Sequence, residues 1–259
     1  MAEGTKDAIG ALRRAHDELA ATARRLDHLA LTTKSGSEEW TVAQVFSHLG
    51  SAAEISVKTL QAGKADPDGA EPVWERWNAM IPEEQASNFV ASEERYVEAL
   101  ENLNEEELST KKVDVGFLPA PIDVGFFVGL RSSEVALHGW DIDVAFDKTA
   151  TVRAFLVPYV LNRLPLFAGF FAQSSSKSGK VSINTTDPSR FYVLELRDDG
   201  TSLSEEDAPA ADAGTKVEMP AEALLRLTAG RLSPDRTPAG VTAEGELALE
   251  DLRSVFPGY

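Results

Sequence analysis

The chain has 259 residues, of which 43% are hydrophobic, and it carries a net charge of -17 and no cysteine. The hydrophobic content is sufficient for a folded core, whereas the acidic charge repels phosphate backbones and anionic lipid headgroups and argues against nucleic acid or membrane surfaces as partners. Without cysteine the chain has no disulfide, thiolate metal ligand or thiol nucleophile of its own, so thiol chemistry requires a thiol from outside.

The N-terminal segment leads directly into a charged helical pattern and has no apolar core of the signal-peptide type. The longest apolar stretch, 155–171, is interrupted by Pro158, Arg163 and Pro165, which argues against a membrane-spanning helix. We expect a cytoplasmic protein that is a monomer or a homodimer.

Helical periodicity begins near the N-terminus. Apolar residues recur at alternating steps of three and four over 9–30, which predicts one long amphipathic helix. Thr41 is followed three residues later by Gln44, and because this spacing has the form of a capping box, a second helix should begin at Thr41. The polar segment 63–71 contains Gly and Pro and should be a loop.

Two further long helices are expected in the first half. One runs from about 83 to 102. After a charged link at 104–114, the next helix carries Glu134 and His138. Four principal helices within residues 1–150 predict a helical bundle.

The sequence pattern changes near residue 175, where a Ser- and Lys-containing segment replaces the helical periodicity. Alternating β-branched and aromatic residues predict strands, and Asp198-Asp199-Gly200 is typical of a hairpin turn. The expected elements are strands at 181–185, 191–196 and 241–245, an acidic loop at 205–214, and helices at 221–229 and 247–255. Residues 151–259 therefore read as a helical linker and a small α+β domain.

Glu134 and His138 are the most informative residues of the chain. They lie four residues apart on an expected helix and so project from one face, while His48 lies on the apolar side of the second helix. Two imidazoles and a carboxylate with a fourth position open are a usual ligand set for a catalytic divalent metal of the zinc type. The pattern thus indicates a metal-dependent enzyme.

The same residues also permit structural interpretations. A single histidine on an apolar face is commonly a hydrogen-bonded core residue, and Glu134 with His138 can form a solvated pair on a helix surface. Asp141 either accepts the ring N–H of His138 or has a purely structural contact. His16 lies in the apolar stripe of the first helix and either lines the same cavity as the candidate ligands or, as we favour, is buried and structural, whereas His28 should be exposed.

Three segments carry a resemblance to a known family. They are Trp40-Thr-Val-Ala-Gln-Val-Phe-Ser-His48-Leu, then Leu130-Arg-Ser-Ser-Glu134-Val-Ala-Leu-His138-Gly-Trp-Asp141-Ile, and finally Ala223-Leu-Leu-Arg-Leu-Thr-Ala-Gly230-Arg231-Leu followed by Ala243-Glu-Gly245. Together they resemble the mycothiol-dependent maleylpyruvate isomerase family, within the wider DinB-like group of metal-binding four-helix bundles. The resemblance covers nearly the whole chain.

The resemblance implies an α+β fold in two domains: a DinB-like four-helix bundle over 1–150, then a helical linker and a small sterol-carrier-like α+β domain over 151–259. It implies that His48, Glu134 and His138 hold a divalent metal, most commonly zinc, and that mycothiol is the cosubstrate. It also implies a catalytic arginine in the C-terminal domain. Arg231 is our choice and Arg236 its rival, although a cation there also suits the carbonyl end of a helix.

These expectations lead to one hypothesis for the reaction and two alternatives. The hypothesis is an isomerase or transferase that adds a mycothiol-type thiol to an electrophilic, carboxylate-bearing small molecule, because a bound metal stabilises the thiolate. Arg131 either binds the substrate carboxylate or, as we favour, pairs with Glu134 on its own helix. The alternatives are a metal-dependent hydrolase and a non-catalytic protein that binds a small molecule.

Overall fold

The computed structural model describes residues 2–37, 39–175 and 177–258. The chain divides into two compact units, Met1–Ala150 and Thr151–Tyr259. The first unit is mainly helical, and the second combines a five-stranded sheet with short helices. The α+β fold class expected from the sequence is confirmed. None of the described helices is long and apolar enough to cross a membrane.

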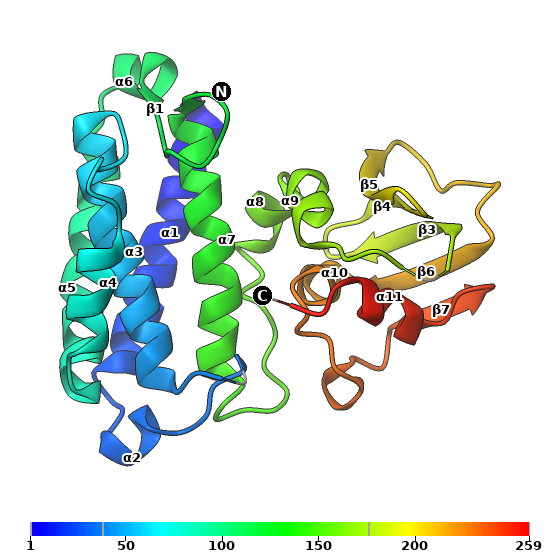
Figure 1. Ribbon diagram of the computed structural model, residues 1–259, viewed down its shortest axis with the longest axis horizontal. Helices are drawn as coiled ribbons and strands as arrows, with labels where there is room; N and C mark the ends of the chain where they lie inside the picture. The colour runs from blue at the N-terminus through cyan, green and yellow to red at the C-terminus, as the bar shows by residue number, and fades with distance from the viewer. Residues whose placement is uncertain (1, 38, 176, 259) are drawn as a thin grey trace. The chain divides into compact units, whose positions relative to one another are not determined.

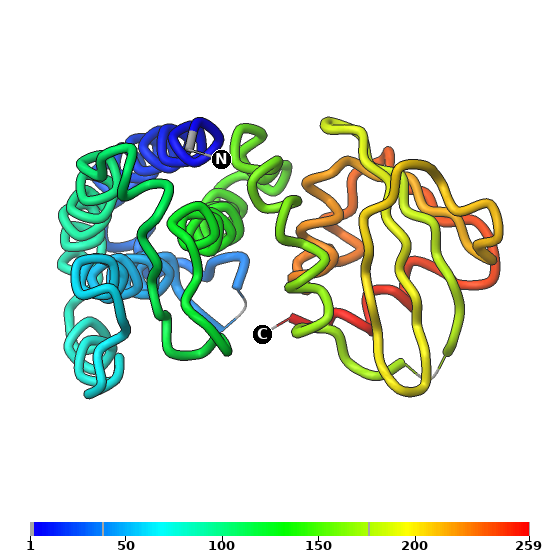
Figure 2. The backbone as a smooth tube through the Cα atoms, turned by 90° about the horizontal axis from the view of Figure 1, so that it is seen from above, coloured from blue at the N-terminus to red at the C-terminus, as the bar shows by residue number. Residues whose placement is uncertain are grey.

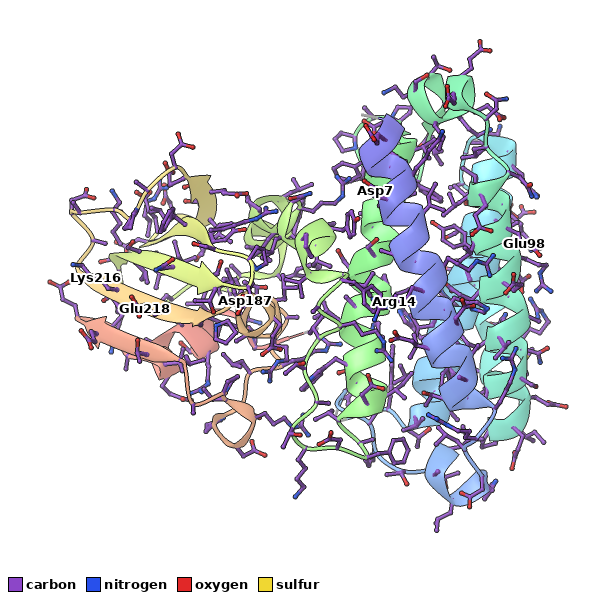
Figure 3. The ribbon with its side chains drawn as sticks, turned by 180° about the vertical axis from the view of Figure 1, so that it is seen from behind. Asp7, Arg14, Glu98, Asp187, Lys216 and Glu218 are labelled. Atoms are coloured by element: carbon purple, nitrogen blue, oxygen red, sulfur yellow. The ribbon has the colours of Figure 1, made fainter. Side chains whose placement is uncertain are left out.

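Four long helices form the first unit: α1 (Ala2–Ala23), α3 (Val42–Ala62), α5 (Pro82–Glu101) and α7 (Val124–Asp143). They lie side by side as a bundle, which Figure 2 shows nearly end-on. Their inward faces bury large apolar side chains, among them Leu12, Phe46, Phe89 and Trp140. Polar residues such as Asp7, Arg14 and Glu98 are exposed on the outer sides of α1 and α5 (Figure 3). The predicted four-helix bundle is therefore confirmed.

Two sequence predictions about the connections are wrong. The first helix does not continue to residue 30, because Asp27 caps a separate short helix, α2 (His28–Leu31), by accepting a hydrogen bond from the Ala30 amide at 2.9 Å. The charged link at 104–114 contains a helix of its own, α6 (Glu105–Thr110), which Asn104 caps. The remaining short elements of this unit are α4 (Glu71–Asn78), β1 (Lys112–Val113) and β2 (Ile122–Asp123).

The two helices that carry the candidate ligands begin at well-defined caps. The Thr41 hydroxyl accepts a hydrogen bond from the Gln44 amide at 3.3 Å, and the Gln44 side chain accepts one from the Thr41 amide at 2.8 Å, which confirms the predicted capping box of α3. The Asp123 carboxylate caps α7 by accepting from the Phe126 amide at 2.7 Å. These caps fix the point along each helix from which the side chains project.

The second unit contains one sheet with strand order β5-β4-β3-β6-β7. Its strands are β3 (Gly179–Thr186), β4 (Arg190–Arg197), β5 (Gly200–Glu206), β6 (Thr215–Pro220) and β7 (Thr242–Gly245). Arg197 and Gly200 pair across a two-residue turn, so the predicted hairpin is confirmed. The strand β6 was not predicted, and it pairs with β3 in parallel, whereas the other pairs are antiparallel.

Short helices accompany the sheet: α8 (Val157–Leu161), α9 (Leu164–Phe171), α10 (Ala221–Thr228), the 3-10 turn η1 (Pro234–Arg236) and α11 (Leu249–Val255). The helix α10 contacts β3 and β6. In β6, Val217 and Met219 are buried, while Lys216 and Glu218 alternate with them and are exposed (Figure 3). This strand therefore has one covered and one open face.

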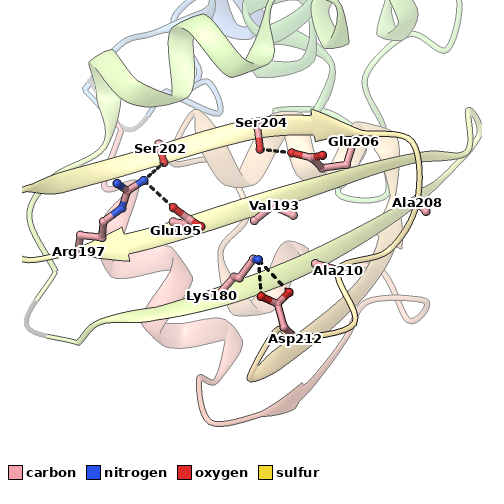
Figure 4. Close-up of a pocket in the computed structure, with 10 residues that line it drawn as sticks. All are labelled: Lys180, Val193, Glu195, Arg197, Ser202, Ser204, Glu206, Ala208, Ala210 and Asp212. Carbon is pink, nitrogen blue, oxygen red and sulfur yellow. Dashed lines mark hydrogen bonds and ion pairs between the residues drawn. The ribbon is translucent and has the colours of Figure 1, made fainter.

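The open face of the sheet holds a polar pocket (Figure 4). Its cations are paired with carboxylates of the same face: Lys180 with Asp212 at 2.8 Å, and Arg197 with Glu195. Within each exposed pair the two charges neutralise each other, and such pairs contribute little to the free energy of unfolding. The pocket therefore presents mutually satisfied charges rather than donors that converge on a ligand.

Candidate metal centre

The bundle brings His48 of α3 together with Glu134 and His138 of α7. The His48 Nε2 atom lies 2.9 Å from Glu134 Oε2, and His138 Nε2 lies 3.6 Å from the same oxygen. One possible ligand atom from each of the three residues lies within 4.8 Å of the other two. Among residues 2–37, 39–175 and 177–258, this is the one group of three or more His, Asp, Glu or Cys side chains that meets this criterion.

The spacing of these atoms fits a zinc-type ion. Nitrogen and oxygen ligands lie about 2.0–2.2 Å from zinc, so two ligands of a tetrahedral site lie roughly 3.3 Å apart. The two measured separations from Glu134 Oε2, 2.9 and 3.6 Å, bracket that value. Neutral imidazole nitrogens and a carboxylate oxygen are also the donor types that zinc accepts. These two separations and the donor types of the three residues fit the ion.

Asp141 orients His138. Its Oδ2 atom lies 2.9 Å from His138 Nδ1, and the Asp141 side chain is fully buried on the same helix. A carboxylate at this position favours the imidazole tautomer with the proton on Nδ1, which leaves the Nε2 lone pair directed at Glu134. The contact of Asp141 with the His138 ring, one of the two roles considered from the sequence, is present in the structure.

The carboxyl group of Glu134 is held in its charged form. Burial raises the pKa of Glu134, but the hydrogen bond with His48 and the nearby charges of His138, His48 and Arg131 outweigh it and lower the pKa to about 2. A charged carboxylate beside two imidazole nitrogens is the protonation state that metal binding requires.

The three side chains differ in their access to solvent. His138 is only 5% exposed, while His48 and Glu134 are 32% and 35% exposed. One side of the cluster is therefore embedded in the bundle, and the other is accessible. This arrangement can admit a further ligand, as a catalytic rather than a closed structural metal site requires.

Trp40 lies against both imidazoles. Its ring centroid is 5.7 Å from that of His138 with an interplanar angle of 26°, and 5.1 Å from that of His48 with an angle of 41°. The two imidazoles themselves meet edge to face at 4.6 Å. Trp40 lies in one of the segments that carry the family resemblance, but the sequence does not indicate this contact, because the residue precedes the helix that carries His48.

Arg131 does not pair with Glu134, and this prediction is wrong. The Arg131 Nη2 and Nε atoms donate to the Glu93 carboxylate of α5, and Nη2 also donates to the Leu49 carbonyl at 2.8 Å. Burial lowers the pKa of Arg131, yet the adjacent Glu93 carboxylate raises it above its usual value. Because the pair is buried in the core, Arg131 is also poorly placed to bind a substrate carboxylate.

The other histidines lie outside the cluster. His16 is 2% exposed, as expected for a structural residue, and its Nε2 atom lies 2.8 Å from the Glu94 carboxylate. The exposed position predicted for His28 is confirmed, since its side chain is 69% exposed and contacts Glu83 at 2.8 Å.

Arg231 belongs to the second unit and is buried. Its Nη1 atom donates at 3.0 Å to the carbonyl of Ala229, the C-cap residue of α10, so the contact with carbonyls at a helix end that was considered from the sequence is present. The rival residue Arg236 lies in η1, where its carbonyl accepts from Arg226 Nη1 at 2.8 Å. The catalytic role of Arg231 stays a prediction.

Comparisons with known proteins cover nearly the whole chain. Residues 12–143 match the model of the mycothiol maleylpyruvate isomerase N-terminal domain, and residues 165–251 match that of the MDMPI C-terminal domain. No curated protein matches. Two similar crystal structures are the mycothiol-dependent maleylpyruvate isomerase and a histidine-to-alanine mutant of it. Their TM-scores are 0.64 and 0.66, with 14% identity over 94% of this chain and 95% of theirs, and they share its fold. The chain belongs to the mycothiol maleylpyruvate isomerase family.

Proposed function

We propose that this protein is a metal-dependent enzyme that adds a mycothiol-type thiol to an electrophilic, carboxylate-bearing small molecule, as an isomerase or a transferase. His48, Glu134 and His138 are the proposed ligands, and zinc is the proposed ion. The observation that carries the proposal is the convergence of two imidazoles and a charged carboxylate in a chain of this family. The absence of cysteine is consistent with a nucleophile supplied by the cosubstrate.

The charge of the ligand set favours a thiolate. Glu134 is the single anionic group among the three, so a divalent ion bound there retains about one positive charge. When bound, such an ion lowers the pKa of a coordinated thiol and so supplies the thiolate form at neutral pH. Asp141 keeps the His138 Nε2 lone pair directed into the site, and the accessible sides of His48 and Glu134 leave room for the thiol.

If the enzyme is an isomerase, the proposed reaction regenerates the thiol at the end of each turnover. The thiolate sulfur forms a bond to one carbon of a conjugated double bond, whose electrons move onto the adjoining carbonyl group. Rotation about the resulting single bond precedes the reverse step, in which the sulfur leaves with its electron pair and the double bond re-forms. A transferase instead protonates the adduct and releases it. We propose Arg231 as a further catalytic residue, on the basis of the family resemblance alone.

Metal analysis and turnover test the proposal together. Protein purified without chelator should contain about one equivalent of a divalent metal, and a content below about a tenth of an equivalent would contradict it. Turnover of a maleyl-type acid should require both the metal and an added thiol. Metal-dependent turnover without a thiol would instead support a hydrolase, and metal without any turnover would support a binding protein.

The His138→Ala variant tests the proposed ligand set most directly. It should abolish metal binding and thiol-dependent turnover while far-ultraviolet circular dichroism shows helix content close to that of the wild type. His28→Ala is the matched control, because its exposed imidazole lies outside the cluster and its loss should leave the metal content unchanged. Full metal content in His138→Ala would remove His138 from the ligand set.

A further inference from the structure

Trp40 packs against the imidazoles of both His48 and His138. Its ring stacks nearly parallel on His138 and is tilted over His48, so a single side chain restricts the rotation of both rings. A metal-bound imidazole also gains positive character, which the face of an indole ring stabilises. The contact is therefore suited to ligand rings, beyond the packing that any aromatic residue would give.

The backbone that presents Trp40 is anchored on both sides of the residue. The Ser35 amide and the Ser35 hydroxyl both donate to the Trp40 carbonyl, each at 3.0 Å. On the following side, Thr41 is the cap of α3. Trp40 is thus held between the hydrogen bonds from Ser35 and the N-cap of the helix that carries His48.

Gly36 connects this turn to the residue that orients His138. The Gly36 amide donates to the Asp141 carbonyl at 2.7 Å. A Cβ atom at Gly36 would lie 2.9 Å from both the Asp141 Cα and Oδ1 atoms, and 2.7 Å from Val144 Cγ1. Only glycine permits this approach, and Asp141 is the residue whose carboxylate contacts His138.

We infer that Trp40 is a positioning residue for both imidazole ligands, and that Gly36 holds it in place by docking the turn on Asp141. The inference rests on the proposed metal site, because it assigns Trp40 the task of keeping His48 and His138 oriented for the ion. Trp40 does not contact reacting atoms in this role. It acts through the two rings and thereby sets the affinity for the metal.

Substitutions of Trp40 test the ring contact directly. Trp40→Leu should weaken the affinity for Zn²⁺ about tenfold, the lower end of the effect of losing a group that orients metal ligands, whereas Trp40→Phe should stay within about twofold of the wild type. Trp74→Leu is the matched control, since Trp74 is 46% exposed on α4 and should leave the affinity unchanged. Isothermal titration with Zn²⁺ alone measures these affinities for folded protein.

Nuclear magnetic resonance provides a readout that does not depend on metal. The chain has only four histidines, so the imidazole signals can be assigned by substitution. In the metal-free protein, the ring current of Trp40 should displace the signals of His48 and His138 but not those of His16 and His28. Trp40→Leu should abolish these displacements, and unchanged signals would overturn the inference.

Gly36→Ala tests the docking without altering a ring. It should weaken Zn²⁺ binding about tenfold and shift the imidazole signals, because the turn must move away from Asp141. Gly10→Ala is its control, as a Cβ there meets no atom within 4 Å. Wild-type binding together with unchanged affinity in Trp40→Leu and Gly36→Ala would overturn this inference and leave the proposed function intact. A wild-type protein that binds no Zn²⁺ would overturn both.

Discussion

Two polar clusters on α7 lie within two helical turns of each other, yet they differ in their exposure to solvent and in their role. Arg131 and Glu93 form a buried pair whose side chains are 3% and 1% exposed. Glu134 and His138 follow on the same helix and contact His48. In this cluster the side chains of His48 and Glu134 are each about one-third exposed. The first cluster is closed and the second is open.

The two clusters differ in how their charged groups are paired. In the closed cluster the Arg131 guanidinium donates to the Glu93 carboxylate and to the Leu49 carbonyl, so the buried cation has its counter-charge, although its Nη1 atom has no hydrogen-bond partner among the described residues. In the open cluster two imidazoles and a carboxylate converge, and one side of the group is accessible. The closed cluster is therefore a structural ion pair, whereas the open cluster, with two imidazoles beside one carboxylate, has the donors of a ligand-binding site.

The closed cluster also supports the open one. Along α3, His48 contacts Glu134, the next residue offers its carbonyl to Arg131, and the carbonyl of Gly50 accepts from Ser92 of α5 at 2.8 Å. Consecutive residues of one helix are thus joined to α7 and α5. The comparison predicts that changes in the closed cluster act mainly on stability and changes around the open cluster mainly on metal affinity.

Breaking the closed cluster should have the largest effect on stability. Arg131→Met leaves the Glu93 carboxylate buried without its partner, which should lower the free energy of unfolding by about 3–5 kcal/mol. Urea unfolding of the metal-free protein measures this loss. The double variant Arg131→Met with Glu93→Leu should recover a large part of it, because no unpaired charge remains. A single variant as stable as the wild type would show that the pair does not hold the bundle.

Asp141→Asn should separate affinity from stability. Loss of the carboxylate at His138 Nδ1 should weaken Zn²⁺ binding about 10–100-fold, equivalent to roughly 1.4–2.7 kcal/mol, since groups that orient metal ligands have effects of this size. The backbone carbonyl that accepts from Gly36 is retained in this variant. Titration with Zn²⁺ gives the affinity. Undiminished binding would show that the contact with His138 does not orient a ligand.

The open cluster could be anticipated from the sequence because its signals are local. Glu134 and His138 lie four residues apart, and the capping box at Thr41 fixes the start of the helix that bears His48. These patterns depend on helix geometry, which the sequence expresses within a few residues. They place Glu134 and His138 on one face, while the convergence of both with His48 was implied by the family resemblance, and the structure brings the three side chains together.

Contacts between residues that lie far apart in the sequence could not be predicted from such local patterns. Glu93 is 38 residues from Arg131, so the nearest acid on the same helix was the natural but incorrect choice. The early end of α1 depends on Asp27, whose cap outweighs an apolar stripe that continues past it. In β6 the alternation of Val217 and Met219 with charged residues is visible, but its parallel pairing with β3 is a tertiary feature.

The carboxylate of Glu54, which belongs to neither cluster, should show an intermediate, pH-dependent effect on stability. Burial raises the pKa of Glu54, but hydrogen bonds from Arg76, Trp77 and Lys58 outweigh it and lower the pKa to about 2. A lowered pKa in the folded state stabilises the protein above about pH 4.5, and this contribution is lost as the pH falls from about 4.5 towards 2. Glu54→Gln should therefore lower the free energy of unfolding by roughly 1–2 kcal/mol near pH 7 and by little near pH 2.

Unfolding by urea at several pH values checks this expectation. The difference between wild type and Glu54→Gln should narrow steadily below about pH 4.5, because protonated Glu54 resembles glutamine in charge. Zn²⁺ affinity near neutral pH should be unchanged, as Glu54 is not part of the ligand group. A difference that stays constant with pH would mean that the ionised carboxylate contributes nothing to stability.

The smallest expected effect comes from the cap of the helix that carries His48. Thr41→Ala removes the hydroxyl that accepts from the Gln44 amide, which should lower the free energy of unfolding by about 1 kcal/mol. Because tertiary packing still holds α3, the affinity of the folded protein for Zn²⁺ should remain within about twofold of the wild type. Urea unfolding and Zn²⁺ titration measure the two quantities on the same preparation. A tenfold loss of affinity would show that the cap also positions His48, and the proposed division between the stability of the bundle and the chemistry of the open cluster would fail at this residue.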